Sequence, residues 1–423
     1  MSKSRIVTAL DIGSSKITTL IAQVTTDPMT LENSVNIVGV SSQPGNGVKK
    51  GQIVDIEDAV ESTIVSVEAA ERMAGYNVNK AFVAVGGAHV SSQNSTGVVA
   101  VSDPDGEVSP DDVERVIESA RAVSLSASRE IIHVIPREFI VDGEAGVRDP
   151  VGMSGVRLEV GTHLVTASSA ALKNLAKTVN GVGIDVEQMV FSGLASSYST
   201  LTDTEKELGC VLIDIGAGTT SIAAFLDGAL AYSGAVPIGA KNVTNDLAIG
   251  LRVSIEQAEK IKIALSNSKD DKDKKYEIID VKENGKSEEK KVARRTLTEG
   301  IIKPRLNELF NMVKSDLEKA GIINKVPSGA VLTGGGALTV GVEDSARRVL
   351  SLPVRIGKPK GVGGLIDDIM SPHYASPIGL VLYAASTSQG ETTSSGGGMQ
   401  GKIKMPKVPI ISKFVDNIRD LLP

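Results

Sequence analysis

Two short stretches of this chain place an aspartate, glycines and small hydroxyl side chains in the same order. The first reads DIGSSK from Asp11, and the second reads DIGAGTT from Asp214. A turn made of Gly, Ser and Thr exposes consecutive backbone N–H groups with no bulky side chain in the way, and such a concave turn favours phosphate oxygens. The hydroxyls add hydrogen-bond donors, and Lys16 adds a positive charge. Each stretch therefore predicts a phosphate-binding loop.

The aspartate before each loop predicts a metal site. A carboxylate cannot approach a phosphate favourably, but it can hold Mg²⁺ through the ion's water shell, because Mg²⁺ gives up water reluctantly. Two such loops can close on one polyphosphate and its metal from opposite sides. A single Asp-Ile-Gly turn is also typical of a plain hairpin, but two in one chain favour the phosphate interpretation. The histidines show no metal-ligand spacing, so we expect no zinc site. They are His89, His133, His163 and His373.

Two further motifs in the second half have side chains or backbone suited to a ligand. Gly334, Gly335 and Gly336 follow the apolar strand AVLT, and we expect them to let the backbone come close to a flat or phosphorylated ligand and to open a helix whose N-terminus favours negative charge. Glu259 and Lys262 lie three residues apart and so share a helix face. Their spacing alone favours a solvated ion pair.

The elements that carry both loops repeat along the chain. Three apolar, β-branched runs, RIVTALDIG, KITTLIAQV and SVNIVGVSS, predict a three-stranded meander around the first loop, and GCVLIDIG, TTSIAAFLDG and ALAYSGAVPIG predict another around the second. A helix is expected after each meander, over 58–73 with Asp55 or Asp58 as its cap, and over 240–251. The repetition predicts a duplicated α/β protein with an insertion in each half.

Each expected insertion has its own pattern. The first is expected over 84–161 and contains a helix capped by Ser109, with Pro110 at the first helical position. In the second half, a hydrophilic run over 269–291 includes one strand-like segment and predicts a loop or a hairpin edge. A helical pattern over 297–321 follows, in which Pro304 either kinks the helix or starts a new turn.

Composition narrows the class of protein. A chain of 423 residues, 41% of them hydrophobic, can bury two or more cores. The net charge of −6, with acidic and basic residues interleaved, argues against a nucleic-acid partner. The single cysteine, Cys210, lies in an apolar strand and predicts a buried thiol in a reducing cytoplasm. No apolar run suits a signal peptide or a membrane span, so we expect any membrane contact to be peripheral.

The C-terminal end has a different composition. Residues 386–401 are rich in Gly, Ser and Thr and predict a flexible linker. The following segment has its apolar residues on one helical face, which favours an amphipathic helix lying in a membrane interface, with lysines suited to anionic lipid. The alternative is a helix that docks on the protein's own globular body. The apolar face contains Ile410, Ile411, Phe414, Val415, Ile418, Leu421 and Leu422.

The order of these motifs resembles the actin-like ATPase superfamily, which includes actin, sugar kinases and Hsp70 chaperones. DIGSSKITT, FSGLASSYS, DIGAGTTSIA, EKIKIALS, LTGGGALTVGV and SPIGLVLYA resemble its first phosphate loop, first connecting helix, second phosphate loop, ribose-contacting helix, adenosine loop and second connecting helix. Within it the chain is similar to the FtsA family, bacterial division proteins that tie FtsZ filaments to the membrane. The short connection over 44–55, the insertion over 84–161 and the linker with a terminal helix make that resemblance specific.

The resemblance implies an α/β, actin-like fold with two lobes, each a ribonuclease-H-like core with an inserted subdomain. The first lobe core would span 1–83 and 162–197 around an insertion at 84–161. The second lobe core would span 198–250 and 310–385 around a subdomain at 251–309. A linker at 386–406 and a membrane-targeting helix at 407–423 would follow.

The resemblance also implies that ATP and Mg²⁺ bind between the lobes. The residues expected to contact phosphates and the metal's waters are Asp11, Gly13, Ser14, Ser15, Lys16, Asp214, Gly216, Gly218, Thr219 and Thr220. Those expected at the nucleoside are Glu259, Lys262, Gly334, Gly335, Gly336 and Ala337. The second loop of the superfamily usually reads Gly-Gly-Gly-Thr with an acidic residue soon after, whereas Ala217 and Ser221 stand here. Ala217 restricts the backbone if that position needs a positive φ. We therefore expect ATP binding with at most slow hydrolysis.

The function that the resemblance implies is a polymer that anchors FtsZ filaments to the cytoplasmic face of the membrane at the division site. The FtsZ C-terminal peptide would bind a basic cluster in the second-lobe subdomain, although such a cluster is also typical of a solvated surface. The cluster contains Arg294, Arg295, Lys303 and Arg305. A small-molecule kinase of the same fold is a second hypothesis, but no aspartate is placed to activate a substrate hydroxyl. A pilus-type adaptor is a third, and it would lack the terminal helix.

Overall fold

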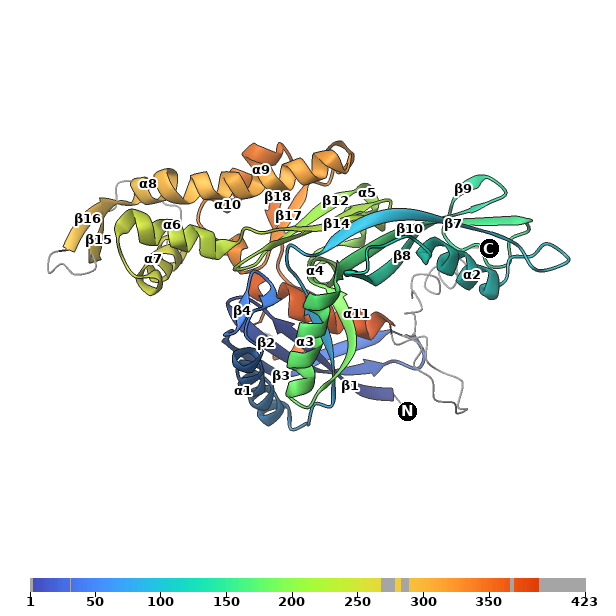
Figure 1. The fold of residues 1–423 in the computed structure, drawn as a ribbon, viewed down its shortest axis with the longest axis horizontal. Helices are drawn as coiled ribbons and strands as arrows, with labels where there is room; N and C mark the ends of the chain where they lie inside the picture. The colour runs from blue at the N-terminus through green and yellow to red at the C-terminus, as the bar shows by residue number, and fades with distance from the viewer. Residues whose placement is uncertain (1–2, 31, 268–277, 283–288, 366–368, 388–423) are drawn as a thin grey trace.

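The computed structural model describes residues 3–30, 32–267, 278–282, 289–365 and 369–387. Two lobes are each built around a separate sheet, and a smaller unit projects from each lobe (Figure 1). The duplicated two-lobed architecture expected from the sequence is confirmed. One hydrophobic core fills the first lobe and extends onto the second-lobe sheet through residues such as Leu212 and Phe225, and another core lies within the second lobe.

The first lobe contains a six-stranded sheet in the order β11-β6-β1-β2-β3-β19. Its strands are β1 (Lys3–Ile12), β2 (Lys16–Thr26), β3 (Asn33–Pro44), β6 (Lys80–Val85), β11 (Asp185–Phe191) and β19 (Gly363–Gly364). β1, β2 and β3 form the predicted meander, and Ile12 pairs with Ile17 beside the turn that carries the first loop. β2 is buried along most of its length because helices cover both faces of the sheet, which explains its nearly continuous apolar run.

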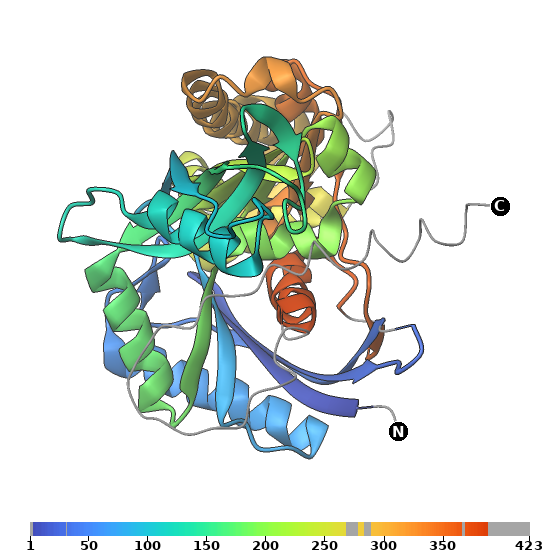
Figure 2. The same cartoon turned by 90° about the vertical axis from the view of Figure 1, so that its right-hand side faces the viewer.

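Four helices belong to the first lobe. They are α1 (Ile56–Ala74), α3 (Ser169–Gly181), α4 (Ser192–Thr200) and α11 (Ala375–Thr387). Of the two predicted caps for α1, the structure uses Asp55, whose side chain accepts a hydrogen bond from the Asp58 N–H at 3.1 Å. α1 packs on β2 and β3, whereas α11 packs on β1 and against α4, on the face that points toward the second lobe (Figure 2).

The second lobe repeats this plan with a five-stranded sheet in the order β14-β13-β12-β17-β18. Its strands are β12 (Cys210–Ile215), β13 (Thr220–Leu226), β14 (Ala229–Val236), β17 (Ala330–Thr333) and β18 (Val354–Ile356). The short helix α5 (Asp203–Leu208) precedes β12, and α4 contacts both β12 and β13, so α4 connects the lobes. Cys210 is fully buried, as predicted, and burial raises the pKa of its thiol to about 12.

The subdomain inserted in the first lobe has a four-stranded antiparallel sheet covered by one helix. Its elements are β7 (Ser91–Ala100), α2 (Pro110–Arg121), β8 (Arg129–Val141), β9 (Glu144–Val147) and β10 (Arg157–Ser168). Ser109 caps α2, as predicted, in a capping box with Asp112. We expected this subdomain over 84–161, but Val85 still belongs to β6 of the first-lobe sheet, and β10 continues to Ser168, with every residue from Thr162 to Ala167 buried.

The second-lobe subdomain combines helices with a small hairpin. Its elements are α6 (Ala240–Leu251), α7 (Ile255–Asn267), β15 (Ile278–Lys282), β16 (Glu289–Ala293) and α8 (Arg294–Leu297). β15 pairs antiparallel with β16, so a hairpin occupies the described part of the hydrophilic run. A π-helical turn, Thr298–Ile302, leads into α9 (Lys303–Lys319), and Pro304 stands in the first turn of that helix. Of the two predicted effects of Pro304, the structure shows the start of a new helical segment.

The glycine cluster after β17 does not open a long helix, and that expectation is wrong. A 3-10 turn, Gly335–Leu338, follows the strand, and α10 (Val342–Leu350) begins only after Gly341. Gly334 and Gly341 have φ values of 80° and 78°, and this left-handed backbone interrupts the path from strand to helix. Two other 3-10 turns are Ile323–Lys325 and Pro372–Tyr374.

Most of the predicted linker and the whole terminal helix lie outside the described residues. Within the described residues, α11 runs to Thr387, so the first two residues of the expected linker are helical. None of the helices described has the length and apolar character needed to cross a membrane.

Candidate functional site

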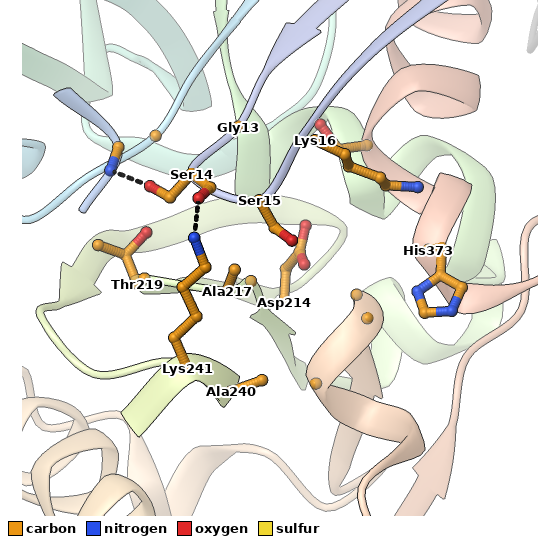
Figure 3. Close-up of a pocket in the computed structure, with 18 of the residues that line it drawn as sticks. Gly13, Ser14, Ser15, Lys16, Asp214, Ala217, Thr219, Ala240, Lys241 and His373 are labelled. Atoms are coloured by element: carbon orange, nitrogen blue, oxygen red, sulfur yellow. Dashed lines mark hydrogen bonds between the residues drawn. The ribbon is translucent and has the colours of Figure 1, made fainter. Parts of the chain in front are cut away.

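The two predicted phosphate loops line one cavity of 710 Å³ between the lobes (Figure 3). Each loop is closed by the same backbone hydrogen bond: the Gly13 N–H donates to the Lys16 carbonyl at 3.0 Å, and the Gly216 N–H donates to the Thr219 carbonyl at 2.9 Å. A Cβ on Gly13 or Gly216 would lie 2.9 Å from that same carbonyl oxygen. Both turns therefore require glycine because a carbonyl oxygen lies too close for a side chain. The two loops share this hydrogen bond and this close contact.

The second loop sits on the N-terminus of α6. The carbonyls of Gly216 and Ala217 accept hydrogen bonds from the N–H groups of Ala240 and Lys241, at 2.9 and 2.8 Å. Ala217 does not have a positive φ. Alanine is therefore unstrained at this position of the loop. The backbone restriction considered for Ala217 applies only at a positive φ, which this residue does not have.

Ser221 stands where the superfamily usually has an acidic residue. Its side chain is buried, and its hydroxyl lies 2.9 Å from the hydroxyl of Ser192 on α4. The position therefore contributes a neutral hydrogen-bonded pair of serines to the cavity wall, with no carboxylate to orient a metal ion or a water molecule.

Asp11 and Asp214 are the penultimate residues of β1 and β12, both line the cavity, and the charge of one acts on the other. Burial raises the pKa of Asp11, against a hydrogen bond from Ser376 and the charge of Lys16. Burial also raises the pKa of Asp214 to about 6; the hydroxyl of Ser196, which donates at 2.6 Å, opposes the shift, and the charge of Asp11 adds to it. Two such carboxylates are stabilised by a divalent cation. Their oxygen atoms are of the kind that could hold Mg²⁺ through its water shell.

Lys16 points away from the other loop. Its ammonium lies 4.2 Å from the centre of the Tyr374 ring, on the side of the cavity where His373 stands (Figure 3). Burial lowers the pKa of Lys16 while the neighbouring Asp11 opposes that shift. Burial, with a smaller contribution from Lys16, also lowers the pKa of His373, so this imidazole is neutral at pH 7. The positive charge of Lys16 thus partly offsets the negative charge of the Asp11 carboxylate.

Glu259 and Lys262 are part of a hydrogen-bonded group at another part of the cavity wall. The Lys262 ammonium donates to Glu259 Oε2 at 2.8 Å and to the Thr244 hydroxyl at 2.9 Å, and that hydroxyl donates to the same Glu259 oxygen at 2.5 Å. Lys262 is only 7% exposed. The pair is therefore an ordered feature of the cavity rather than a solvated surface ion pair.

The glycine cluster packs directly against the end of β12. A Cβ on Gly334 would lie 2.2 Å from Asp214 Oδ1, and a Cβ on Gly336 would lie 2.3 Å from Ile215 Cγ2. A Cβ on Gly335 would meet the His373 imidazole at 2.8 Å. Because these three glycines have no side chains, the turn after β17 can approach the Asp214 carboxylate. The cavity next to this turn also stays open.

The structure brings most of the predicted ligand residues together. The cavity is lined by Asp11, Gly13, Ser14, Ser15, Lys16, Asp214, Gly216, Gly218, Thr219, Glu259, Lys262, Gly334, Gly335 and Gly336. Two predicted residues do not line it. The hydroxyl of Thr220 donates to the carbonyl of Ile238 at 2.8 Å within the second lobe, and Ala337 is buried at 2% exposure in the second-lobe core.

Sequence reasoning missed Lys241, Ser196 and His373. Lys241 begins α6, yet its ammonium donates to the Ser14 carbonyl of the opposite lobe at 2.5 Å (Figure 3). Ser196, on α4, donates a hydrogen bond to the Asp214 carboxylate, and His373, in the turn before α11, lines the cavity. None of the three stands in a glycine-rich motif. The signal available for Ser196 was its place in FSGLASSYS, one of the segments that carried the resemblance.

Comparison with known proteins decides the family. A family model described as "SHS2 domain inserted in FTSA" matches residues 87–166, and one described as "Cell division protein FtsA" matches residues 211–379. The cell division protein FtsA of Pseudomonas aeruginosa is 37% identical over 98% of this chain and 97% of its own length. That of Borreliella burgdorferi is 40% identical over 90% of this chain and 91% of its own length. The chain belongs to the FtsA family.

The fold of this FtsA family member is actin-like, as expected. A solved structure titled "PilM-PilN type IV pilus biogenesis complex" superposes with a TM-score of 0.63, covering 90% of this chain and 98% of that one, at 16% identity. At that identity the likeness shows the fold alone. The match of the inserted-domain model to residues 87–166 agrees with the subdomain observed between β6 and the end of β10.

The four basic residues predicted to bind a partner have different surroundings in this FtsA fold. Arg294 is 7% exposed, and its guanidinium donates to the Leu265 carbonyl at 2.7 Å. Arg305 forms a bidentate pair with Asp246 at 2.6 and 2.9 Å. Lys303 pairs with Glu299 at 2.5 Å, whereas Arg295 is exposed. Arg295 is thus the cluster member most accessible to a partner.

Proposed function

We propose that this protein binds Mg-ATP between its lobes, polymerises in the ATP-bound state and anchors FtsZ filaments to the cytoplasmic face of the membrane at the division site. The observation that supports the nucleotide site is the pair of glycine turns, closed by the same hydrogen bond, that line one cavity. Membership of the FtsA family supports the role in division.

The residues of the cavity fit ATP and Mg²⁺ by their chemistry. Loop backbone and hydroxyl donors suit phosphate oxygens, and Asp11 and Asp214 suit a hydrated Mg²⁺. Glu259 and Lys262 offer one acceptor and one donor to a ribose or a base, and the glycine cluster leaves space for a flat group. When bound, Mg-ATP supplies a phosphoanhydride that can be hydrolysed. Since Ser221 provides no carboxylate, we expect slow turnover.

The nucleotide site is tested by calorimetric titration of the purified full-length protein with Mg-ATP. Asp214→Asn removes a carboxylate proposed to hold the metal and should weaken Mg-ATP binding by at least about tenfold, because a neutral amide attracts a hydrated cation less. Asp227→Asn, in the turn between β13 and β14 away from the cavity, is the matched control. Absence of Mg-ATP binding by the wild-type protein would refute the nucleotide site.

We assign the FtsZ C-terminal peptide to the exposed surface around Arg295. A reversed charge there, Arg295→Glu, should weaken binding of that peptide by about fivefold, since exposed charge pairs contribute up to about 1 kcal/mol, while ATP affinity stays unchanged. Lys260→Glu makes the same charge change at an exposed site on α7 and should leave peptide binding unaltered. Equal peptide affinity for wild type and Arg295→Glu would remove this assignment.

We assign membrane binding to the amphipathic pattern at 407–423, which lies outside the described residues. Sedimentation with anionic liposomes should pellet the full-length protein, more so with Mg-ATP, because a polymer binds through several tails at once. The chain truncated after Gly401 should stay in the supernatant. Phe414→Glu on the apolar face should act like the truncation, and Asn417→Glu on the polar face should not. Pelleting of the truncated chain would place the anchor elsewhere.

The proposed self-association uses the inserted subdomain of one copy and a lobe of its neighbour. The alternatives drawn from the sequence, a pilus-type adaptor and a small-molecule kinase, have less support. The pilus complex shares the fold at 16% identity, whereas division proteins share 37% identity over nearly the whole chain. Electron microscopy of the protein with Mg-ATP on lipid monolayers would show filaments if the polymer proposal holds and isolated particles if it fails.

A further inference from the structure

One lysine bridges the two lobes at the phosphate loops. The Lys241 ammonium, on the second-lobe helix α6, donates a hydrogen bond of 2.5 Å to the carbonyl of Ser14 in the first loop. Figure 3 shows its side chain extended from α6 toward Ser14, with Ala217 and Thr219 of the second loop beside it. Lys241 is exposed and lines the same cavity as both loops.

The backbone of Lys241 is fixed to the second loop. Its N–H donates to the Ala217 carbonyl at 2.8 Å, and the preceding N–H of Ala240 donates to Gly216 at 2.9 Å. The side chain therefore starts from a rigid point on one loop and ends on the other. A movement of the second lobe relative to the first changes the distance between Lys241 and Ser14 directly.

Ser14 is also held from a second direction. Its hydroxyl accepts a hydrogen bond of 2.8 Å from the Gly51 N–H, in the turn between β4 (Val48–Lys49) and β5 (Gln52–Ile53). That turn has positive φ at Lys50 and Gly51, 50° and 71°. It also touches the second loop, because a Cβ on Gly218 would lie 3.0 Å from Lys50 Cα. Both loops and this turn thus meet around Ser14.

A neutral carbonyl is a weak partner for an ammonium group compared with an ionised phosphate. The hydrogen bond from Lys241 to Ser14 has a charged donor and a neutral acceptor, whereas a phosphate oxygen would add the Coulomb attraction of a second full charge. A terminal phosphate between the two loops would therefore draw Lys241 away from Ser14. Lys16, the lysine of the first loop, interacts electrostatically with Asp11 and lies over the Tyr374 ring on another side of the cavity.

We propose that Lys241 distinguishes a nucleoside triphosphate from a diphosphate by exchanging the Ser14 carbonyl for the terminal phosphate. This inference rests on the proposed nucleotide site and adds its regulation. Without the terminal phosphate, Lys241 holds the first loop to the second lobe. With it, Lys241 binds the phosphate, and Ser14 and the β4–β5 turn are released from that restraint.

The test compares ATP and ADP affinities of full-length wild type, Lys241→Met, Lys241→Arg and the control Lys260→Met by calorimetric titration with Mg²⁺ present. Lys241→Met should lose at least tenfold in ATP affinity and no more than threefold in ADP affinity, because it keeps the length of the side chain and removes the charge. Lys241→Arg should recover most of the ATP affinity. Lys260→Met removes an exposed charge on α7 and should change neither.

The outcomes separate this proposal from the nucleotide site itself. If wild type binds neither nucleotide, the proposed site fails, and the role of Lys241 fails with it. If wild type binds both, and Lys241→Met loses both equally or neither, the role of Lys241 alone is overturned.

Hydrogen exchange of the nucleotide-free proteins gives a second readout that does not depend on ligand. Lys241→Met should exchange faster than wild type in the peptide that contains Gly51, because the loop that accepts its N–H has lost one restraint. Lys260→Met should match wild type. Unchanged exchange around Gly51 in Lys241→Met would overturn the proposed hold on Ser14. Equal melting temperatures of the variants would exclude general unfolding as the cause.

Discussion

The two phosphate loops have the same backbone and different support. Gly13 and Gly216 make the same turn with the same internal hydrogen bond. The first loop rests on the β4–β5 turn through Ser14, whereas the second rests on the N-terminus of α6 through its own carbonyls. The two copies thus share the glycine turn and differ in the elements that support it.

The groups that surround the aspartate of each loop also differ. Asp11 has Lys16 beside it, and this charge opposes the effect of burial on its pKa. For Asp214, the hydroxyl of Ser196 opposes the effect of burial, and Asp11 adds repulsion, so its pKa reaches about 6. Burial is thus offset by a hydroxyl and a charged lysine at Asp11, but by a hydroxyl alone at Asp214.

The largest expected effect is at the glycine turn that packs on Asp214. Gly334→Ala should lower the free energy of unfolding by more than about 3 kcal/mol and abolish Mg-ATP binding, because its Cβ would lie 2.2 Å from the Asp214 carboxylate. Gly341→Ala is the matched control: its φ of 78° is similar to the 80° of Gly334, but nothing lies within 4 Å of its Cβ. It should cost only about 1–2 kcal/mol. Urea unfolding measures both, and equal losses would show that backbone strain alone matters at Gly334.

A smaller and symmetrical effect is expected at the first glycine of each loop. Gly13→Ala and Gly216→Ala should each cost about 1–3 kcal/mol of stability, since each Cβ would lie 2.9 Å from a carbonyl oxygen. Each should also weaken Mg-ATP binding. Thermal unfolding and calorimetric titration of the two variants test the equivalence of the loops. A loss of ATP affinity in only one of them would mean that a single loop holds the phosphates.

The pH dependence of binding should follow the second carboxylate. If Asp214 holds a hydrated cation only when ionised, Mg-ATP affinity should approach its full value about one unit above pH 6 and fall as the pH drops through about 6. At pH 5 the loss should approach tenfold, because about one carboxylate in ten is then ionised. Ser196→Ala removes a hydrogen bond that lowers this pKa and should move the transition to higher pH. Calorimetric titrations with Mg-ATP between pH 5 and 8 measure this transition. If Ser196→Ala leaves the transition at the same pH, a group other than Asp214 is responsible for it.

Local patterns in the sequence were sufficient to predict much of this site. The alternation of apolar residues predicted both meanders, and the small residues after Asp11 and Asp214 predicted both loops, because these features depend on neighbours along the chain. Similarly, the caps at Asp55 and Ser109 are set within a few residues of the helix start.

The remaining features depend on residues far apart in the sequence. Lys241 meets Ser14 only because the lobes close on each other, and the spacing of residues around Lys241 does not encode that approach. Likewise, Arg294 belongs to a basic run, yet the packing of α8 near α7 buries it against the Leu265 carbonyl. The glycine cluster resembled a helix start, but the left-handed φ of Gly334 and of Gly341 was not visible in the sequence.

The smallest expected effect is at the residue that departs from the usual second loop. Ala217→Gly recovers the superfamily sequence, yet it should change ATP affinity by less than about twofold, because Ala217 does not have a positive φ and glycine relieves no strain there. Its stability should fall by up to about 1 kcal/mol, since glycine loses more backbone entropy on folding than alanine. Titration and urea unfolding measure the two quantities. A large gain in ATP affinity would show that the bound loop adopts a backbone that alanine resists, and the second loop would then differ from the first in conformation as well as in charge.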